Sequence, residues 1–273
     1  MWPRRARPKP DAPLPAPEPV VVVREDYRAQ RLDLLRSFFD PEQARGLEIG
    51  ASDLPTVPPG EGRCEFADWR STECLAEEFG LPIASLAPVT YVLDRERPIQ
   101  AQIPHVFDYV ILCHVIEHVA DPVGYLIEIA ALVRDGGVLL LAIPDKRQTL
   151  DAVRPSTTLD QLLARHYHRE SSPSLEQVME FSRAWSDEAQ QLAASSPRAF
   201  FDWSVSIFES GRQDAHCNVW RDDEFVVQLG ALIRGGFLPG LQIAAQRPTV
   251  PPFNEFYVAL RKLDPAAERA ALL

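Results

Sequence analysis

Hydrophobic residues along this chain gather in short runs that alternate with segments of helical periodicity. Seven runs, each bounded by Gly, Pro or charged residues, read as strands. They cover residues 46–50, 64–68, 89–93, 107–113, 138–143, 241–245 and 255–260. The runs at 107–113 (FDYVILC) and 138–143 (VLLLAI) are almost wholly apolar, which is typical of strands covered on both faces of a parallel sheet.

Helices are expected between these strands. Ser71 or Thr72 is a suitable cap for one helix, and Asp121-Pro122 opens another in the preferred order of cap followed by proline. The expected helices cover residues 27–39, 71–79, 122–133 and 222–232, and a turn at 135–137 (DGG) ends the third. Alternating strands and helices predict an α/β fold whose parallel sheet is built with right-handed crossovers.

Two segments depart from this alternation. Residues 152–215 contain amphipathic stretches at 159–167 and 175–192, which we interpret as a helical insertion beside the sheet. Residues 1–22 are rich in proline and include a basic cluster, so a disordered tail is expected there. The remaining residues, 23–273, are expected to form one domain that carries the insertion.

Composition narrows the classes of function. The chain is 46% hydrophobic and 25% charged, as in globular proteins, and its net charge of -11 argues against a nucleic-acid partner. No apolar run approaches the roughly 18 residues that span a bilayer, so no integral membrane segment is expected. The four cysteines form no CxxC pair, and proline interrupts the N-terminal region where a signal peptide needs apolar residues. A cytoplasmic location is therefore expected, while nothing in the sequence indicates an oligomeric state.

Candidate binding residues follow the ends of the predicted strands. Ligands of open parallel sheets bind beyond the carboxyl ends of the strands. A glycine there lets the backbone approach a ligand closely, and an acid after the next strand can accept the two hydroxyls of a ribose. Residues at these ends are Glu48, Gly50, Ala51, Ser52, Asp68, Asp94, Cys113, His114 and Asp145.

The order of these segments is more specific than any one of them. The chain reads LEIG at 47–50, then Asp68 and Asp94, HVIEH at 114–118, Asp121-Pro122, Gly136-Gly137 and AIPDKR at 142–147. This order resembles class I S-adenosylmethionine-dependent methyltransferases, in particular a methyltransferase type 11-like bacterial group with EH-x-x-DP and IPDKR segments. The resemblance covers about residues 45–147 and the last strand. It implies a Rossmann-like, doubly wound, mostly parallel seven-stranded sheet with an antiparallel last strand.

The resemblance also implies a cofactor, S-adenosylmethionine, and roles for single residues. Glu48, Gly50 and Ala51 would surround its methionine part, with Ser52 in the same loop. Asp68 would bind the ribose hydroxyls, and Asp94 would lie near the adenine. Cys113 and His114 would border the sulfonium.

The glycine loop departs from the usual G-x-G-x-G pattern of such enzymes. It reads Gly50-Ala51-Ser52-Asp53-Leu54, and the prolines at 55, 58 and 59 follow. Because proline restricts where a helix can begin, we expect no helix directly after the first strand and no helix N-terminus at the cofactor there.

The segment His114-x-x-Glu117-His118 also matches the inverted zinc-protease pattern. On a helix, residues 114 and 118 would share one face, but the segment follows a buried strand and has no recognisable third ligand. We therefore assign no metal ligands. Magnesium-assisted methyl transfer, as in ubiquinone-type O-methyltransferases with an acid and a histidine here, is an alternative.

His118 and His216 are the candidate catalytic residues. A hydroxyl acceptor gains from losing its proton as it attacks, and a histidine can accept that proton. His118 could instead cap a loop or pack beneath the cofactor, and His216, in the segment DAHCNVW, could lie in a surface turn. His166 and His168 are interpreted as part of a solvated helix face.

Asp145 and Arg147 are the candidate substrate-binding residues, for an anionic or sugar substrate. Arg147 could equally pair with Asp145 or Asp151.

The predicted function is methyl transfer to an oxygen of a small-molecule or glycan-related acceptor. The alternative is a catalytically idle scaffold that binds the cofactor and acts through its tail or helical insertion. A nicotinamide-dependent oxidoreductase would need the full G-x-G-x-x-G pattern, which the sequence lacks.

Overall fold

The seven expected strands form one sheet in the order β3-β2-β1-β4-β5-β7-β6 in the computed structural model, which describes residues 24–211 and 214–264. The strands are β1 (Arg45–Ile49), β2 (Arg63–Asp68), β3 (Tyr91–Val92), β4 (Phe107–Cys113), β5 (Val133–Pro144), β6 (Leu241–Arg247) and β7 (Glu255–Lys262). The first five are parallel, and β7 runs antiparallel between β5 and β6. The predicted α/β fold with its antiparallel last strand is confirmed, whereas the predicted tail, 1–22, lies outside the described residues.

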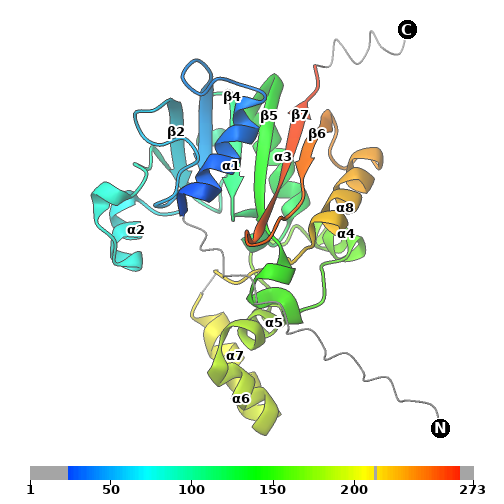
Figure 1. Cartoon of the computed structure of the whole chain (residues 1–273). Helices are drawn as coiled ribbons and strands as arrows, with labels where there is room; N and C mark the ends of the chain where they lie inside the picture. Colours follow the sequence, from blue (N-terminus) through cyan, green and yellow to red (C-terminus); the bar gives the residue numbers. More distant parts are fainter. Residues whose placement is uncertain (1–23, 212–213, 265–273) are drawn as a thin grey trace, which may run out of the picture.

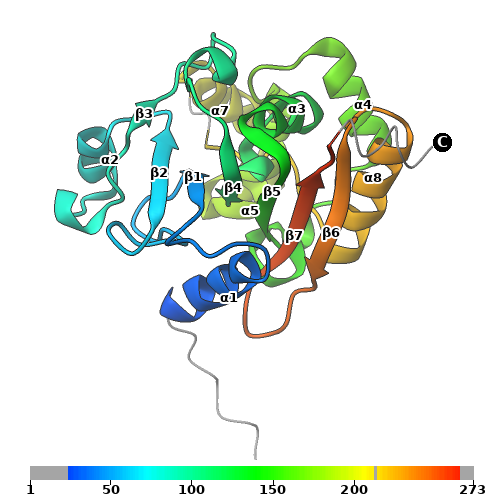
Figure 2. The same cartoon turned by 90° about the horizontal axis from the view of Figure 1, so that it is seen from above.

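Both faces of the sheet are covered, as the apolar strands require. Alternate residues of β4 point to opposite sides. Tyr109 and Ile111 pack with α1 (Arg24–Arg36), while Val110 and Leu112 join the larger core with α3 (Pro122–Leu132) and α8 (Asp222–Arg234). Figure 2 shows α1 on one side of the sheet and α3 on the other. This burial fixes β4 at the centre, so its carboxyl end is a rigid support for whatever follows it.

Local deviations from the expected elements have identifiable causes. No helix follows β1, as the prolines predicted, and α2 (Thr72–Phe79) begins only after β2, capped by Ser71. The turn expected at 135–137 is instead an irregularity within β5, which pairs with β4 on both sides of it. Gly136 takes a φ of +77° there, a conformation that glycine adopts readily.

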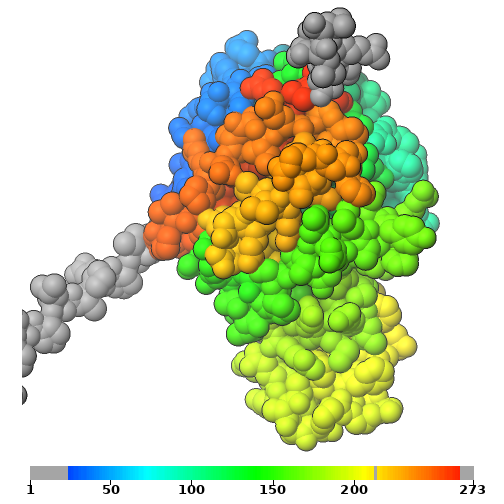
Figure 3. All heavy atoms as spheres, turned by 90° about the vertical axis from the view of Figure 1, so that its right-hand side faces the viewer, coloured from blue at the N-terminus to red at the C-terminus, as the bar shows by residue number. Residues whose placement is uncertain are grey.

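The helical insertion is narrower than predicted. Leu162 of α4 (Leu159–His168) belongs to the main core, so this helix is part of the α/β body. Helices α5 (Leu175–Trp185), α6 (Asp187–Ser195) and α7 (Pro197–Glu209) pack on one another and stand as a lobe beyond the carboxyl edge of the sheet (Figures 1 and 3). The prediction of one continuous helical stretch over 175–192 was wrong. The backbone is extended at Ser186, and Oγ of Ser186 accepts a hydrogen bond from the Ala189 amide, which begins α6.

Across residues 24–211 and 214–264, no helix has the length and apolar character that crossing a membrane requires.

Candidate active site

Gly50 and Asp68 lie side by side where β1 and β2 end. The parallel register pairs Ile49 with Ala67, and the Gly50 amide donates to the Ala67 carbonyl oxygen at 3.0 Å. Gly50 has a φ of +77°, and a Cβ at this position would lie 2.7 Å from Cγ2 of Val115. Only glycine therefore lets the loop pass this closely to the segment after β4.

The half-buried Asp68 carboxylate ends β2 next to this glycine. Its Oδ1 accepts from the Arg70 amide at 3.1 Å. Burial raises the pKa of Asp68, although amide hydrogen bonds and the Arg70 charge act in the opposite direction. A partly desolvated carboxyl group at this edge suits a ligand that donates hydroxyl hydrogens. Asp94, by contrast, is exposed and its Oδ1 accepts from the Glu96 amide at 2.9 Å.

Glu48 lies beneath the loop that follows β1. It is fully buried, and its carboxylate accepts from the Thr56 amide at 2.8 Å and the Thr56 hydroxyl at 3.0 Å. Cys113 lies beside them, with its Sγ 3.6 Å from Oγ1 of Thr56. In the same loop Ala51 packs against Phe66, and the Ser52 carbonyl oxygen accepts from Ala87 at 2.8 Å. Glu48 and Cys113 thus both contact Thr56 of the proline-rich loop, and their contact with the cofactor stays a prediction.

His114 follows β4 in a left-handed conformation, with a φ of +53°. Its Nε2 lies 2.7 Å from Oε2 of Glu255, the first residue of β7. The same carboxylate accepts from Arg31 at 2.9 and 2.6 Å and from the Tyr257 hydroxyl at 2.7 Å. Burial opposes the charge of Glu255, but His114 and Arg31 outweigh it and lower its pKa to about 2.

Sequence reasoning missed Glu255. An acid at the start of an otherwise apolar strand, EFYVAL, was the available signal.

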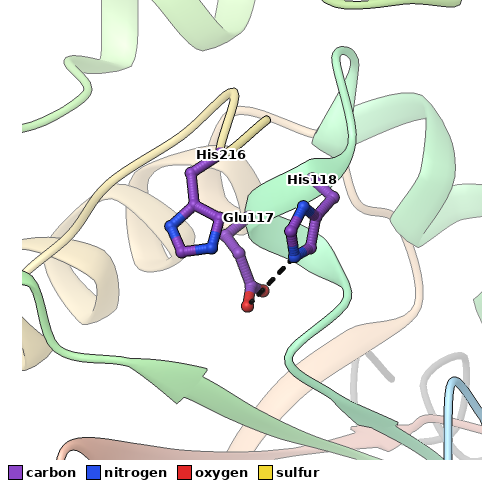
Figure 4. Close-up of side chains that lie close together, drawn as sticks. All are labelled: Glu117, His118 and His216. Atoms are coloured by element: carbon purple, nitrogen blue, oxygen red, sulfur yellow. Dashed lines mark ion pairs between the residues drawn. The ribbon is translucent and has the colours of Figure 1, made fainter. Parts of the chain in front are cut away.

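Glu117, His118 and His216 converge beyond the end of β4 (Figure 4). The two imidazole rings meet edge to face with their centroids 4.7 Å apart. His118 Nε2 lies 3.9 Å from Oε1 of Glu117, and His114 Nδ1 lies 3.7 Å from the same oxygen. Glu117 is 1% exposed, and within the described ranges neither of its carboxylate oxygens has a hydrogen-bond partner.

This pairing depends on contacts between two segments that are distant in sequence. The backbone amide of Asn218 donates to the carbonyl oxygen of Glu117 at 3.0 Å. The side-chain Nδ2 of Asn218 donates to the carbonyl oxygen of Val119 at 2.7 Å. Cys217 Sγ donates to the His118 carbonyl oxygen at 3.3 Å. The segment after the insertion is therefore attached to the segment after β4, which places the two predicted catalytic histidines together.

The two histidines have different surroundings. His216 Nδ1 lies 2.5 Å from Oδ2 of Asp151, which Arg154 holds at 2.8 Å. Burial disfavours the charge of His216, but Asp151 and Glu117 outweigh this effect and raise its pKa. Burial lowers the pKa of His118, and the charge of Glu117 only partly opposes this. Neither Glu117 nor Asp151 was assigned a role from sequence, although Glu117 stands three residues after His114.

Asp145 and Arg147 form the internal ion pair that the sequence left open. Arg147 donates to both oxygens of the fully buried Asp145 and also to Asp222 of α8 at 2.6 Å. Burial alone would raise the pKa of Asp145, but the hydrogen bonds from Arg147 lower it. The pair joins the end of β5 to α8. Both side chains that were predicted to bind the substrate therefore already have partners within the protein. His166 likewise pairs with Asp121 at 3.0 Å, whereas His168 is exposed.

A cavity that is open to solvent lies between α5, α7 and the segment before His216. Its lining is mostly apolar and aromatic: Val178, Phe181, Ser182, Trp185, Trp203, Ile207, Asp214 and Ala215. The Phe181 ring lies 5.1 Å from the His216 ring, so the cavity borders the histidine pair. The sequence identified the insertion but could not show which faces of its helices meet.

Rossmann-like sheets with this strand order and these carboxyl-edge residues define a class of cofactor-binding enzymes. A family model described as "Methyltransferase domain" matches residues 23–229, and the chain belongs to this family. The chain thus contains a methyltransferase domain of the S-adenosylmethionine-dependent class. No curated protein matches the chain.

Solved structures give distant likenesses. The carbon methyltransferase CurJ has 14% identity and a TM-score of 0.45, over 88% of this chain and 54% of that one. This chain therefore spans about half the length of that protein. A provisionally assigned zinc-dependent alcohol dehydrogenase from Rhodobacter sphaeroides has 13% identity and a TM-score of 0.49, covering 86% and 90%. An S-adenosylmethionine-dependent methyltransferase from Clostridium acetobutylicum has 8% identity and a TM-score of 0.47, covering 89% and 93%.

The residues at this edge fit the cofactor. Gly50 turns the backbone at the end of β1 with a φ of +77° and no room for a Cβ beside Val115, and the partly buried Asp68 next to it can accept hydroxyl hydrogens. Glu48 and Thr56 hold the loop between them without a helix N-terminus. The contacts of the predicted residues with the cofactor stay predictions, namely those of Glu48, Gly50, Ala51, Ser52, Asp68, Asp94, Cys113 and His114.

Proposed function

We propose that this methyltransferase acts on a hydroxyl oxygen of a small, ring-containing acceptor, including glycan-related molecules. The observation that carries the proposal is the position of the His118–His216 pair. It lies between the end of β4 and the aromatic cavity of the insertion. An acceptor held in that cavity would present its reactive group to the two imidazoles.

The lining of the cavity supports a ring-shaped acceptor. Phe181, Trp185 and Trp203 offer flat apolar surfaces, while Ser182 and Asp214 supply the few polar groups that orient a ligand. Because the cavity is open to solvent, the bound acceptor would itself displace water from between the two helices.

The chemistry requires alignment and removal of one proton. S-adenosylmethionine supplies a methyl group on a positively charged sulfur, and S-adenosylhomocysteine remains after the carbon–sulfur bond breaks and the carbon–oxygen bond forms. Gly50 and Asp68 would fix the donor at the sheet edge, and the insertion would fix the acceptor. His118 and His216 lie together beside the cavity, and we propose them as the catalytic residues that take the proton of the hydroxyl.

Binding and turnover test the proposal separately. Calorimetry should show that wild type binds S-adenosylmethionine and that Asp68→Asn binds it at least about 10-fold more weakly. Asp135→Asn, in the irregular part of β5, is the matched control and should bind as wild type does. Absence of binding to wild type would overturn the assignment of this edge to the cofactor.

Turnover is measured with tritium-labelled S-adenosylmethionine and a panel of sugars, glycosides and phenols. His118→Ala and His216→Ala should each lower kcat by about 100-fold or more, whereas His168→Ala should not change it. Equal turnover in all variants would remove the histidines from the mechanism. Cofactor binding with no turnover on the whole panel would contradict the proposed acceptor class and favour the idle scaffold.

A further inference from the structure

Glu117 has surroundings that a buried carboxylate does not normally tolerate. It is 1% exposed, and in the part of the chain that the structure describes both oxygens lack hydrogen-bond partners. The nearest imidazole nitrogens, at 3.7 and 3.9 Å, are too distant for hydrogen bonds. An ionised group buried without a partner is strongly destabilising, so this geometry calls for a cation.

The neighbouring side chains form a compact ligand set for such a cation. One donor atom each from Glu117, His118 and His216 lies within 4.8 Å of the others. Donor atoms on one zinc ion, at about 2.1 Å from it, lie about 3.4 Å apart in a tetrahedral site. Small rotations of the side chains would therefore bring the three donors onto one ion, as their convergence in Figure 4 suggests.

His216 is already prepared as a ligand. Its Nδ1 faces Asp151 at 2.5 Å, and Arg154 fixes Asp151 in turn. A carboxylate on one ring nitrogen sets the tautomer and leaves the other nitrogen, Nε2, free to bind a metal, an arrangement common among histidine ligands. Asp151 is thus a positioning residue for His216.

We propose that Glu117, His118 and His216 bind one divalent transition-metal ion, of the zinc type, at the acceptor side of the site. Two imidazoles and one carboxylate suit zinc or its neighbours in the first transition row better than magnesium, which prefers oxygen ligands and water. This set differs from the sequence-based expectation of no metal. It also differs from the H-x-x-E-H pair, because Nε2 of His114 is engaged by Glu255 and His216 completes the set instead.

The role of the ion in catalysis rests on the proposed function. Three protein ligands leave a position open, and an acceptor hydroxyl bound there would release its proton to solvent more readily, as zinc-bound water does. The two histidines would then act on the acceptor through the ion. Binding of the ion itself does not depend on methyl transfer.

The test uses untagged full-length protein treated with a chelator and then titrated with Zn²⁺ or Mg²⁺ in competition with a fluorescent chelator. Wild type should bind one Zn²⁺ per chain in preference to Mg²⁺. His216→Ala and Glu117→Gln should each weaken Zn²⁺ binding by about 100-fold, and Asp151→Asn by about 10-fold. The exposed His168→Ala should bind as wild type does. Co²⁺ in the same site should give a visible absorption band that His216→Ala loses.

Several results would overturn the inference. They are absence of Zn²⁺ binding to wild type, unchanged binding in His216→Ala, and a Glu117→Gln variant that loses S-adenosylmethionine affinity but keeps Zn²⁺ affinity. Circular dichroism spectra and thermal unfolding show whether each variant is folded, and Glu117→Gln keeps the side-chain shape. S-adenosylmethionine binding without Zn²⁺ binding would refute only the metal site, whereas the reverse would refute only the proposed function.

Discussion

Glu255 brings three side chains from separate parts of the chain to one carboxylate. Arg31 of α1, His114 after β4 and Tyr257 all donate to it, and both Arg31 and Glu255 are buried. Their mutual hydrogen bonds make the charges tolerable in the interior, and removal of one charge leaves the other uncompensated. Loss of the Glu255 charge would therefore leave the buried Arg31 without its counter-charge.

We expect Glu255→Gln to lower the free energy of unfolding by about 3 kcal/mol, because it leaves the buried Arg31 charge without its partner. Urea denaturation followed by fluorescence measures the change. Asp202→Asn, which removes the exposed ion pair with Arg198 on α7, is the control and should leave the midpoint unchanged. Equal midpoints for the two variants would contradict this account of the buried cluster.

A second prediction at this scale compares two glycines with similar backbone angles. Gly50 and Gly60 have φ values of +77° and +87°, but only at Gly50 would a Cβ meet a neighbour, Val115. Gly50→Ala and Gly60→Ala should both be mildly destabilised, by about 1–2 kcal/mol. Only Gly50→Ala should lose S-adenosylmethionine affinity, on the order of 10-fold by calorimetry. Similar affinities would mean that the close approach at Gly50 does not serve the cofactor.

Single residues at the site were predictable when their position alone carried the signal. Gly50 and Asp68 follow strands whose apolar pattern is clear, so their place at the edge could be read from sequence. Glu255 and Asp151 could not, because their importance lies in partners 224 and 65 residues away. For Asp145 the sequence left open both substrate binding and pairing with Arg147, and the structure shows the pair, in which Arg147 also contacts α8.

At the scale of elements, the insertion lobe determines what can reach the histidine pair. Trp203 of α7 lines the cavity, while Phe208 on the same helix is exposed. Trp203→Ala should raise the KM for the acceptor by about 10-fold and leave the affinity for S-adenosylmethionine unchanged, because it removes only apolar contact area. Phe208→Ala should change neither quantity. Steady-state kinetics with an acceptor from the panel would decide, and unchanged KM values in both variants would place the acceptor elsewhere.

Elements with strong periodicity were predicted well, and those set by local contacts were not. The bounds of β4 match the apolar run at 107–113, since burial on both faces leaves no ambiguity. β3 covers only Tyr91–Val92 of the predicted strand at 89–93, because it is an edge strand with a single neighbour. The break between α5 and α6 depends on the Ser186 hydroxyl, a competition between capping and helix propagation that periodicity does not register.

For the molecule as a whole, the lowered pKa of Glu255 predicts how stability depends on pH. The pKa falls from an ordinary value of 4.5 to about 2 in the folded state, where the carboxylate faces Arg31, His114 and Tyr257. The stabilisation is therefore present above pH 4.5 and is lost as the pH falls towards 2. The difference in unfolding free energy between wild type and Glu255→Gln should shrink over this interval. A difference that stays constant would assign the effect of the substitution to packing rather than charge.

The sheet and its covering helices could be predicted from the sequence, whereas the position of the insertion and its cavity could not. Alternating strands and helices predicted a parallel sheet with covering helices, and the family resemblance implied its doubly wound, seven-stranded form. The placement of α5, α6 and α7 beyond the carboxyl edge, and the cavity between them, required the three-dimensional packing of faces that are only moderately apolar. The attachment of Asn218 to Glu117 was equally hidden, because it uses backbone groups.

The position of β7 between β5 and β6 has a consequence for synthesis of the protein. Arg31 and His114 leave the ribosome long before residue 255, and the Arg31 and Glu255 partners are 224 residues apart. A nascent chain can pair β1 to β5 in parallel but cannot neutralise Arg31 or fix His114 until β7 has inserted. Such late, long-range closure delays completion of this part of the fold until β7 has been synthesised. A ribosome-bound chain arrested before β7 should therefore be sensitive to proteases around α1 and should not bind S-adenosylmethionine.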